Sequence, residues 1–117
     1  MDKRMNDEKI KTLDVLVDAM EIIENARSIK DLSPDGRLEL EKTAVLLRNI
    51  ERSIIRLKTE QMLSEIAKDA LLLNKLAEKI ERKAQKLAGV ARAIEKAAKV
   101  VELFVQIASK TISGGML

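Results

Sequence analysis

The sequence of 117 residues contains no cysteine, no histidine, no tryptophan and no tyrosine. The missing cysteines exclude disulfides, thiol nucleophiles and thiolate-bound metals, and the missing histidines remove the most frequent general acid–base group. The sequence also has no glycine-rich loop that could cradle a phosphate, and no serine in the setting of a nucleophile elbow. We therefore expect a protein that is not an enzyme and holds no cofactor.

Long apolar runs are absent as well. The first residues, MDKRMNDEKIK, are charged and no apolar stretch follows them, which argues against a secretory signal. No stretch approaches the ~20 apolar residues that span a bilayer. The lack of cysteine fits a reducing compartment. Together these features predict a soluble cytoplasmic protein.

Aromatic residues are nearly absent, since Phe104 is the only one. Hydrophobic residues nevertheless make up 46% of the chain and charged residues 35%, a balance typical of amphipathic helices. Strand-rich proteins usually contain more aromatic and β-branched residues. A chain of this length has room for one core, so we predict a single all-α domain over residues 1–117.

Proline occurs once, in the segment DLSPDGR at residues 31–37. Ser33 can cap a helix, and Pro34 suits the first helical position because its missing N–H has no helical partner there. Apolar residues recur at spacings of three and four on both sides of this segment. The pattern predicts helices over 6–31 and 34–58, and the short connection makes them an antiparallel hairpin.

The rest of the chain, up to its last few residues, contains a single glycine, Gly89. Apolar residues alternate steps of three and four from Leu63 to Ile112, and the pattern passes through Gly89 undisturbed. We therefore predict one helix over 60–112, about 78 Å long, followed by a flexible tail at 113–117.

Alanine recurs at every seventh position of this segment, at Ala70, Ala77, Ala84, Ala91 and Ala98. Small residues that alternate with large ones let a second helix approach closely. The hairpin formed by the first two helices, ~39 Å long, would cover only half of this seam and leave an apolar stripe exposed. We therefore predict a helical bundle or coiled coil that forms a homodimer. The alternative is a monomeric four-helix up-down bundle with a turn near Gly89.

This seam predicts a function in protein–protein interaction, as an adaptor or scaffold. The partner is a second copy of the chain or another protein. The predicted contact surface consists of Leu73, Ala77, Ile80, Ala84, Leu87, Ala91, Ile94, Ala98, Val101 and Val105.

Three carboxylates, Asp14, Asp18 and Glu21, follow one another at i, i+4 and i+7 on one face of the first predicted helix. Without histidine and without an EF-hand loop, they do not favour a metal site. Two interpretations stay open. The strip is either a solvated face or a surface that binds a basic partner.

Positive charge gathers in the second half of the chain. Residues 1–58 hold 12 basic and 12 acidic side chains, whereas residues 59–117 hold 10 and 7. A basic stripe at 4-3-4 spacing lies in this half and consists of Lys75, Lys79, Arg82 and Lys86. An alternative function is therefore nucleic-acid binding through phosphate contacts, although no aromatic side chain is present to stack on bases.

The segment 83–112 combines basic residues with an apolar C-terminal part, VVELFVQIA. This make-up gives a further alternative, an amphipathic helix that lies on a membrane surface. Burial in a protein interface is the simpler interpretation, because helices that are apolar on most sides are usually buried.

Overall fold

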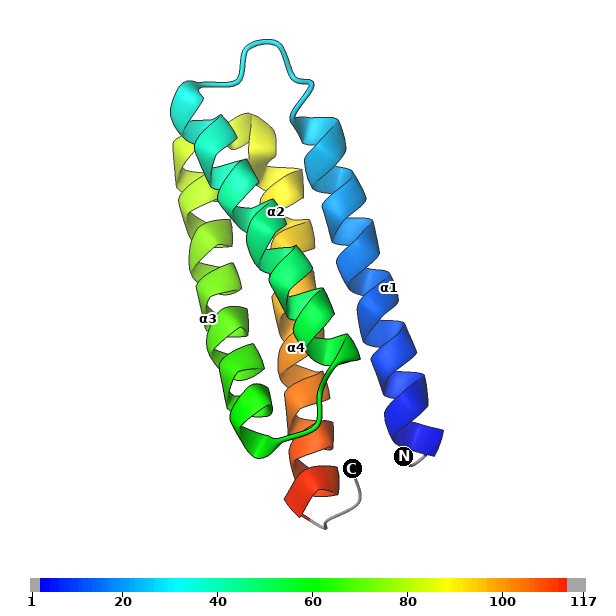
Figure 1. Cartoon of the computed structure of the whole chain (residues 1–117). Coiled ribbons are helices and arrows are strands. Elements are labelled where there is room, and N and C mark those ends of the chain that lie inside the picture. Colours follow the sequence, from blue (N-terminus) through cyan, green and yellow to red (C-terminus); the bar gives the residue numbers. More distant parts are fainter. Residues whose placement is uncertain (1–2, 114–117) are drawn as a thin grey trace.

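The computed structural model describes residues 3–113, and the side chains of residues 3–111. In this range the chain forms a four-helix bundle with up-down packing (Figure 1). Its elements are α1 (Lys3–Ala26), α2 (Pro34–Ile55), α3 (Glu60–Lys83), the short 3-10 helix η1 (Gln85–Leu87) and α4 (Ala88–Ser113). The bundle measures 50 × 20 × 18 Å. The predicted all-α class is confirmed, and of the two predicted architectures the four-helix bundle is the observed one.

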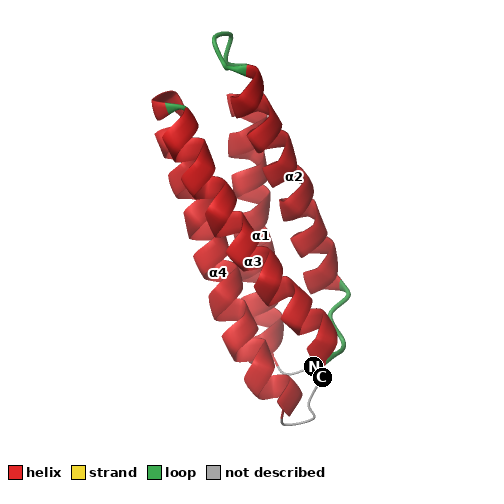
Figure 2. Ribbon diagram, turned by 90° about the vertical axis from the view of Figure 1, so that its left-hand side faces the viewer, coloured by secondary structure: helices red, strands yellow, loops and turns green. Residues whose placement is uncertain are grey.

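Each helix packs against two others. α1 contacts α2 and α4, and α3 contacts the same two helices, so α1 and α3 lie diagonally across the bundle. Figure 2, in which α3 faces the viewer, shows the four nearly parallel axes. The connection between α2 and α3 lies at the same end of the bundle as the start of α1 and the end of α4 (Figure 1). The α1–α2 connection and the turn before α4 lie at the opposite end.

Two predicted helix starts are confirmed, and side chains cap both of them. The Ser33 hydroxyl accepts a hydrogen bond from the backbone N–H of Gly36 at 3.0 Å, with Pro34 at the first helical position. The Thr59 hydroxyl accepts one from the N–H of Met62 at 3.1 Å. Because each cap satisfies a donor that has no helical partner, α2 begins at Pro34 and α3 at Glu60.

Other predicted boundaries are wrong. The first helix begins at Lys3 rather than at 6, and it ends at Ala26 rather than at 31. The second helix ends at Ile55 rather than at 58. The chain needs residues 27–33 to cross the end of the bundle, and Leu32 in this connection is buried, with its Cδ1 against Gly36. Of the predicted tail at 113–117, Ser113 ends α4 and the remaining residues lie outside the described range.

The single long helix predicted over 60–112 is also wrong. Its backbone breaks at Ala84, which is extended (φ −150°, ψ 107°) and ends α3. The N–H of Leu87 then donates to the carbonyl of Ala84 at 2.9 Å and closes the tight turn of η1. The reversal lies at residues 84–87, and Gly89 lies after it, exposed near the start of α4.

The heptad spacing of apolar residues continues across this turn because the turn begins and ends at inward-facing residues. Ala84 is half-buried before the reversal, Leu87 is fully buried after it, and Ala91 continues the buried face in α4. A hairpin whose two arms pack on each other therefore shows the same spacing as one uninterrupted helix. The hairpin is favoured because it buries apolar surface that a straight helix of this length would leave in water.

The predicted contact surface is thus the inside of the monomer. Eight of its ten residues are buried at 0 or 1% exposure, and Ala84 and Val105 are half-buried. The alanines do make room for another helix, as predicted, but that helix belongs to the same chain, because α3 and α4 pack on each other. The homodimer prediction was based on an uncovered apolar stripe, and that stripe is covered within the monomer.

One buried side chain in the bundle carries a charge. Glu39 of α2 is 3% exposed, and its Oε1 lies 3.6 Å from Nζ of Lys83 and 3.9 Å from Nζ of Lys42. Its Oε2 is buried without a hydrogen-bond partner among the described residues. Because Lys83 is the last residue of α3, this ion pair joins α2 to α3 directly beside the break at Ala84.

Replacement of Ala91 by leucine tests the close packing of α3 on α4. Ala91 is completely buried, so the added volume should overpack the seam and lower the free energy of unfolding by about 1–3 kcal/mol. Urea unfolding followed by circular dichroism measures this change. The matched control is Ala84→Leu at the half-buried turn, which should cost clearly less; equal costs at both positions would contradict the packing described here.

The Glu39 ion pair generates a second prediction. Lys83→Met should lower the free energy of unfolding by about 1–3 kcal/mol, because it leaves a buried carboxylate without its nearest cation. Adding Glu39→Met to this variant should recover most of the loss, since an apolar side chain of similar size often replaces a buried ion pair without cost. Lys86→Met is the control, because Lys86 pairs at 3.9 Å with the exposed Asp31 and should change stability by less than about 1 kcal/mol.

Candidate functional site

A groove of about 560 Å³ runs along the outside of the bundle between α2 and α3. It extends over Leu38 to Asn49 on α2, about 17 Å of helix, and over Leu72 to Lys79 on α3. Its lining consists of Leu38, Glu41, Lys42, Val45, Leu46 and Asn49 from α2, and of Leu72, Lys75, Leu76 and Lys79 from α3.

The groove is apolar although it faces solvent. Leu38, Val45 and Leu72 are 49%, 55% and 49% exposed, and the half-buried Leu46 and Leu76 also line it. Leu38 and Val45 lie seven residues apart and therefore on the same side of α2. The core-facing side of α2 is occupied by Leu40, Leu47 and Ile54, so the two residues have no place in the core. The groove thus collects large apolar side chains that the fold leaves exposed.

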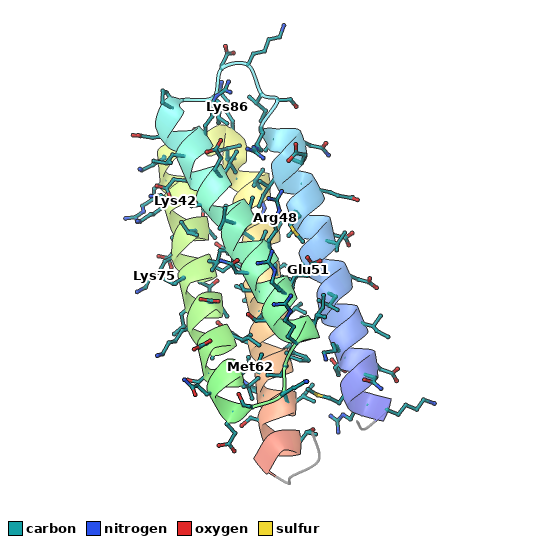
Figure 3. All side chains as sticks on the ribbon, in the orientation of Figure 1. Lys42, Arg48, Glu51, Met62, Lys75 and Lys86 are labelled. Carbon is teal, nitrogen blue, oxygen red and sulfur yellow. The ribbon has the colours of Figure 1, made fainter. Side chains whose placement is uncertain are left out.

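Three lysines lie along this apolar surface. Lys42 comes from α2, and Lys75 and Lys79 come from α3. Figure 3 shows Lys42 and Lys75 on the same side of the bundle. The one acidic residue of the lining, Glu41, is paired with Arg27 at 3.3 Å. The groove therefore presents a positive border.

The predicted basic stripe does not persist as one continuous line. Three of its residues are exposed on α3, namely Lys75, Lys79 and Arg82. Lys86 lies after the break at Ala84, in η1, and pairs with Asp31. Lys75 and Lys79 border the apolar groove instead, whereas Lys79, Arg82 and Lys83 line a separate small hollow. Nucleic-acid binding through these charges stays a prediction.

The predicted acidic strip lies on α1, the helix diagonal to α3. Asp14, Asp18 and Glu21 are exposed, and none of the three belongs to an ion pair within residues 3–111. Asp18 and Glu21 border a shallow hollow between α1 and α4, which Lys96 also lines. The strip and the groove are therefore separate surfaces of the bundle.

The segment 83–112, predicted as a possible membrane-surface helix, is not one helix: it runs from the last residue of α3 through the break at Ala84 and η1 into α4. Val101, Phe104 and Ala108 are buried in the core, whereas Leu103 on α4 is 57% exposed. No helix within the described residues is long and apolar enough to cross a membrane. Among these residues there is also no group of acidic side chains that could hold a metal ion.

Among residues 3–111, Lys9 and Asp69 have shifted pKa values, and both lie outside the groove lining. Partial burial raises the pKa of Asp69, and the charge of Glu65 one helical turn earlier raises it further. Partial burial lowers the pKa of Lys9. Asp69 lies on α3 one turn before Leu72, and the α3 residues that line the groove include no carboxylate.

The exposed groove residues Leu38, Val45 and Leu72 were not among the residues predicted from the sequence. A signal for them existed, because Leu38 and Val45 fall outside the apolar face of Leu40, Ala44, Leu47 and Ile50 that the spacing marks. Apolar residues outside the core-facing side of a helix form a groove only when a neighbouring helix, here α3, lines its other side.

Replacement of Asp69 by asparagine tests the raised pKa. A carboxyl whose pKa is raised by folding destabilises the folded state when ionised, so the cost exists at neutral pH and disappears as the pH falls below the ordinary carboxyl range. Asp69→Asn should therefore raise the free energy of unfolding slightly at pH 7, by less than about 0.5 kcal/mol because solvent screens this largely exposed group, and the gain should vanish in acid. Glu65→Gln should give a smaller gain, because burial is the larger cause; no gain from either variant would contradict the assignment.

Comparison of the chain with protein-family models, with curated proteins and with solved structures gives no match. The functional argument therefore depends on the geometry and chemistry of the groove.

Proposed function

We propose that this protein is a non-enzymatic protein-interaction module, and that its α2–α3 groove binds an amphipathic helix with acidic residues beside its apolar stripe. The observation that carries the proposal is the groove itself, in which Leu38, Val45 and Leu72 are half exposed between lysines. Large apolar side chains gathered on one surface of a soluble domain are typical of interaction sites.

The shape of the groove favours a helix as the bound element. Its length along α2 corresponds to about three helical turns, and the seven-residue interval between Leu38 and Val45 matches the repeat of an apolar helix face. Amphipathic helices commonly bind in this way, with apolar anchors at positions i, i+3, i+4 and i+7. The bundle supplies both walls on regular helices, so the groove is formed before a partner arrives.

The charge along the groove favours an acidic partner. Lys42, Lys75 and Lys79 border the apolar residues, and the charge of Glu41 is opposed by Arg27. Charges around an apolar centre contribute mainly to partner selection and to the rate of association. An acidic amphipathic helix would meet complementary charge, whereas a basic one would be repelled.

A labelled model peptide tests this function. The peptide is an amphipathic helix of alanine, with leucines along one stripe and glutamates beside it, and binding is measured by fluorescence anisotropy at low salt. We expect saturable binding that weakens as salt rises. A control peptide with lysines in place of the glutamates should bind at least about tenfold more weakly, a difference of about 1.4 kcal/mol.

Matched protein variants locate the binding. The double variant Val45→Asp, Leu72→Asp should reduce affinity for the glutamate peptide at least about tenfold, because it removes apolar contacts and adds repulsion. Leu103→Asp is the control, since Leu103 is 57% exposed on α4 and does not line the groove. Equal binding of both peptides, or equal loss in both proteins, would contradict the proposal.

A further inference from the structure

A surface of the kind that the groove would bind is present on this same chain. Residues 12–26 of α1 carry four acidic side chains and no basic one. All four are exposed, and three of them, Asp14, Asp18 and Glu21, belong to no ion pair within residues 3–111. Beside them Ile10 and Val17 are 60% and 41% exposed on the outside of the bundle. Over residues 12–26 the outer face of α1 is therefore acidic and amphipathic, while Ile10 lies between Lys9 and Lys11. No other helix of its own chain covers this face.

The two surfaces share the same spacing. Ile10 and Val17 lie seven residues apart on α1, as Leu38 and Val45 do on α2. Seven residues are about 10.5 Å of helix, or nearly two turns, so both apolar residues of one surface can meet the apolar wall of the other. Asp14 and Glu21 are also seven residues apart, and they lie beside Ile10 and Val17. On the groove, lysines lie beside the apolar residues in the corresponding way.

These surfaces cannot meet within one chain. α1 packs against α2 and α4, whereas the groove opens outward between α2 and α3. Within residues 3–111, no ion pair involves Asp14, Asp18, Glu21, Lys75 or Lys79. Lys42 of the groove pairs with Glu39 at 3.9 Å, so the charges available to a second molecule are those of Lys75 and Lys79 on the groove and of the three carboxylates on α1.

We propose that the α2–α3 groove of one copy binds the outer face of α1 of a second copy. This inference rests on the proposed function and names the occupant of the groove. The contact joins two different surfaces, so it is heterologous, and each added copy brings a free groove and a free α1. Association is then head to tail, and it continues until a ring closes or the concentration limits it.

Variants that disable one surface each can test this arrangement. The groove variant is Val45→Asp, Leu72→Asp, and the α1 variant is Ile10→Asp, Val17→Asp; all four side chains are at least 41% exposed in the bundle. Circular dichroism checks that each variant keeps its helices. Light scattering on a size-exclusion column, over a dilution series, gives the mass. The wild-type mass should rise with concentration, and each variant alone should stay monomeric.

An equimolar mixture of the two variants is the decisive sample. The groove variant still has an intact α1 and the α1 variant still has an intact groove, so the mixture should form a 1:1 complex and nothing larger. A wild-type protein that stays monomeric at every concentration would overturn the inference. So would a wild-type protein whose association is unchanged in the α1 variant, because the occupant of the groove would then not be α1.

Charge reversal provides a second test on the full chain. Asp14→Lys, Glu21→Lys should abolish association, and adding Lys75→Glu, Lys79→Glu to the same chain should restore it; Lys42 is left unchanged because it pairs with the buried Glu39. Failure of this rescue in a folded protein would count against the pairing. The glutamate peptide separates the two proposals: if it binds the wild-type groove while the protein itself never associates, the proposed function stands and the self-association fails. If neither occurs, both fail.

Discussion

The close packing of α3 against α4 is the constraint on which the rest of the bundle depends. Fully buried alanines such as Ala77 and Ala91 let these two helices approach, while Leu73, Ile80 and Ile94 fill the space beside them. Two helices that are consecutive in the chain can meet along this length only if the chain reverses between them. The extended residue Ala84 and the short η1 provide that reversal, and α1 and α2 then complete the bundle.

The end of the bundle that holds the reversal also contains a buried charged side chain, Glu39, the only one among residues 3–111. A buried carboxylate adds little net stability, because desolvation opposes the attraction to its cation. The position of Glu39 matters for another reason, since its nearest cation is Lys83 at the end of α3. Other registers of α2 against α3 would separate this carboxylate from Lys83 and leave it only the more distant Lys42 of its own helix, so the pair favours the observed register.

The surface follows from what the core cannot accommodate. Each helix buries one face, and the apolar residues outside these faces stay in contact with water. On α2 and α3 they lie beside lysines and line a groove, and on α1 they lie beside carboxylates on the outward face. Both proposals made for this protein depend on that opposition of charge.

The sequence by itself determined the all-α class, the starts of α2 and α3 and the residues of the buried seam, because caps and apolar spacing are local properties of the chain. It did not determine the reversal at Ala84, since a helical hairpin and one long helix show the same heptad spacing when the turn preserves the phase. It also did not reveal the groove, which needs Val45 and Leu72 side by side although they are far apart along the chain. Only the tertiary structure decided these points, because the burial of α3 against α4 outweighs the helical hydrogen bonds lost at the turn, and the same packing sets α2 beside α3.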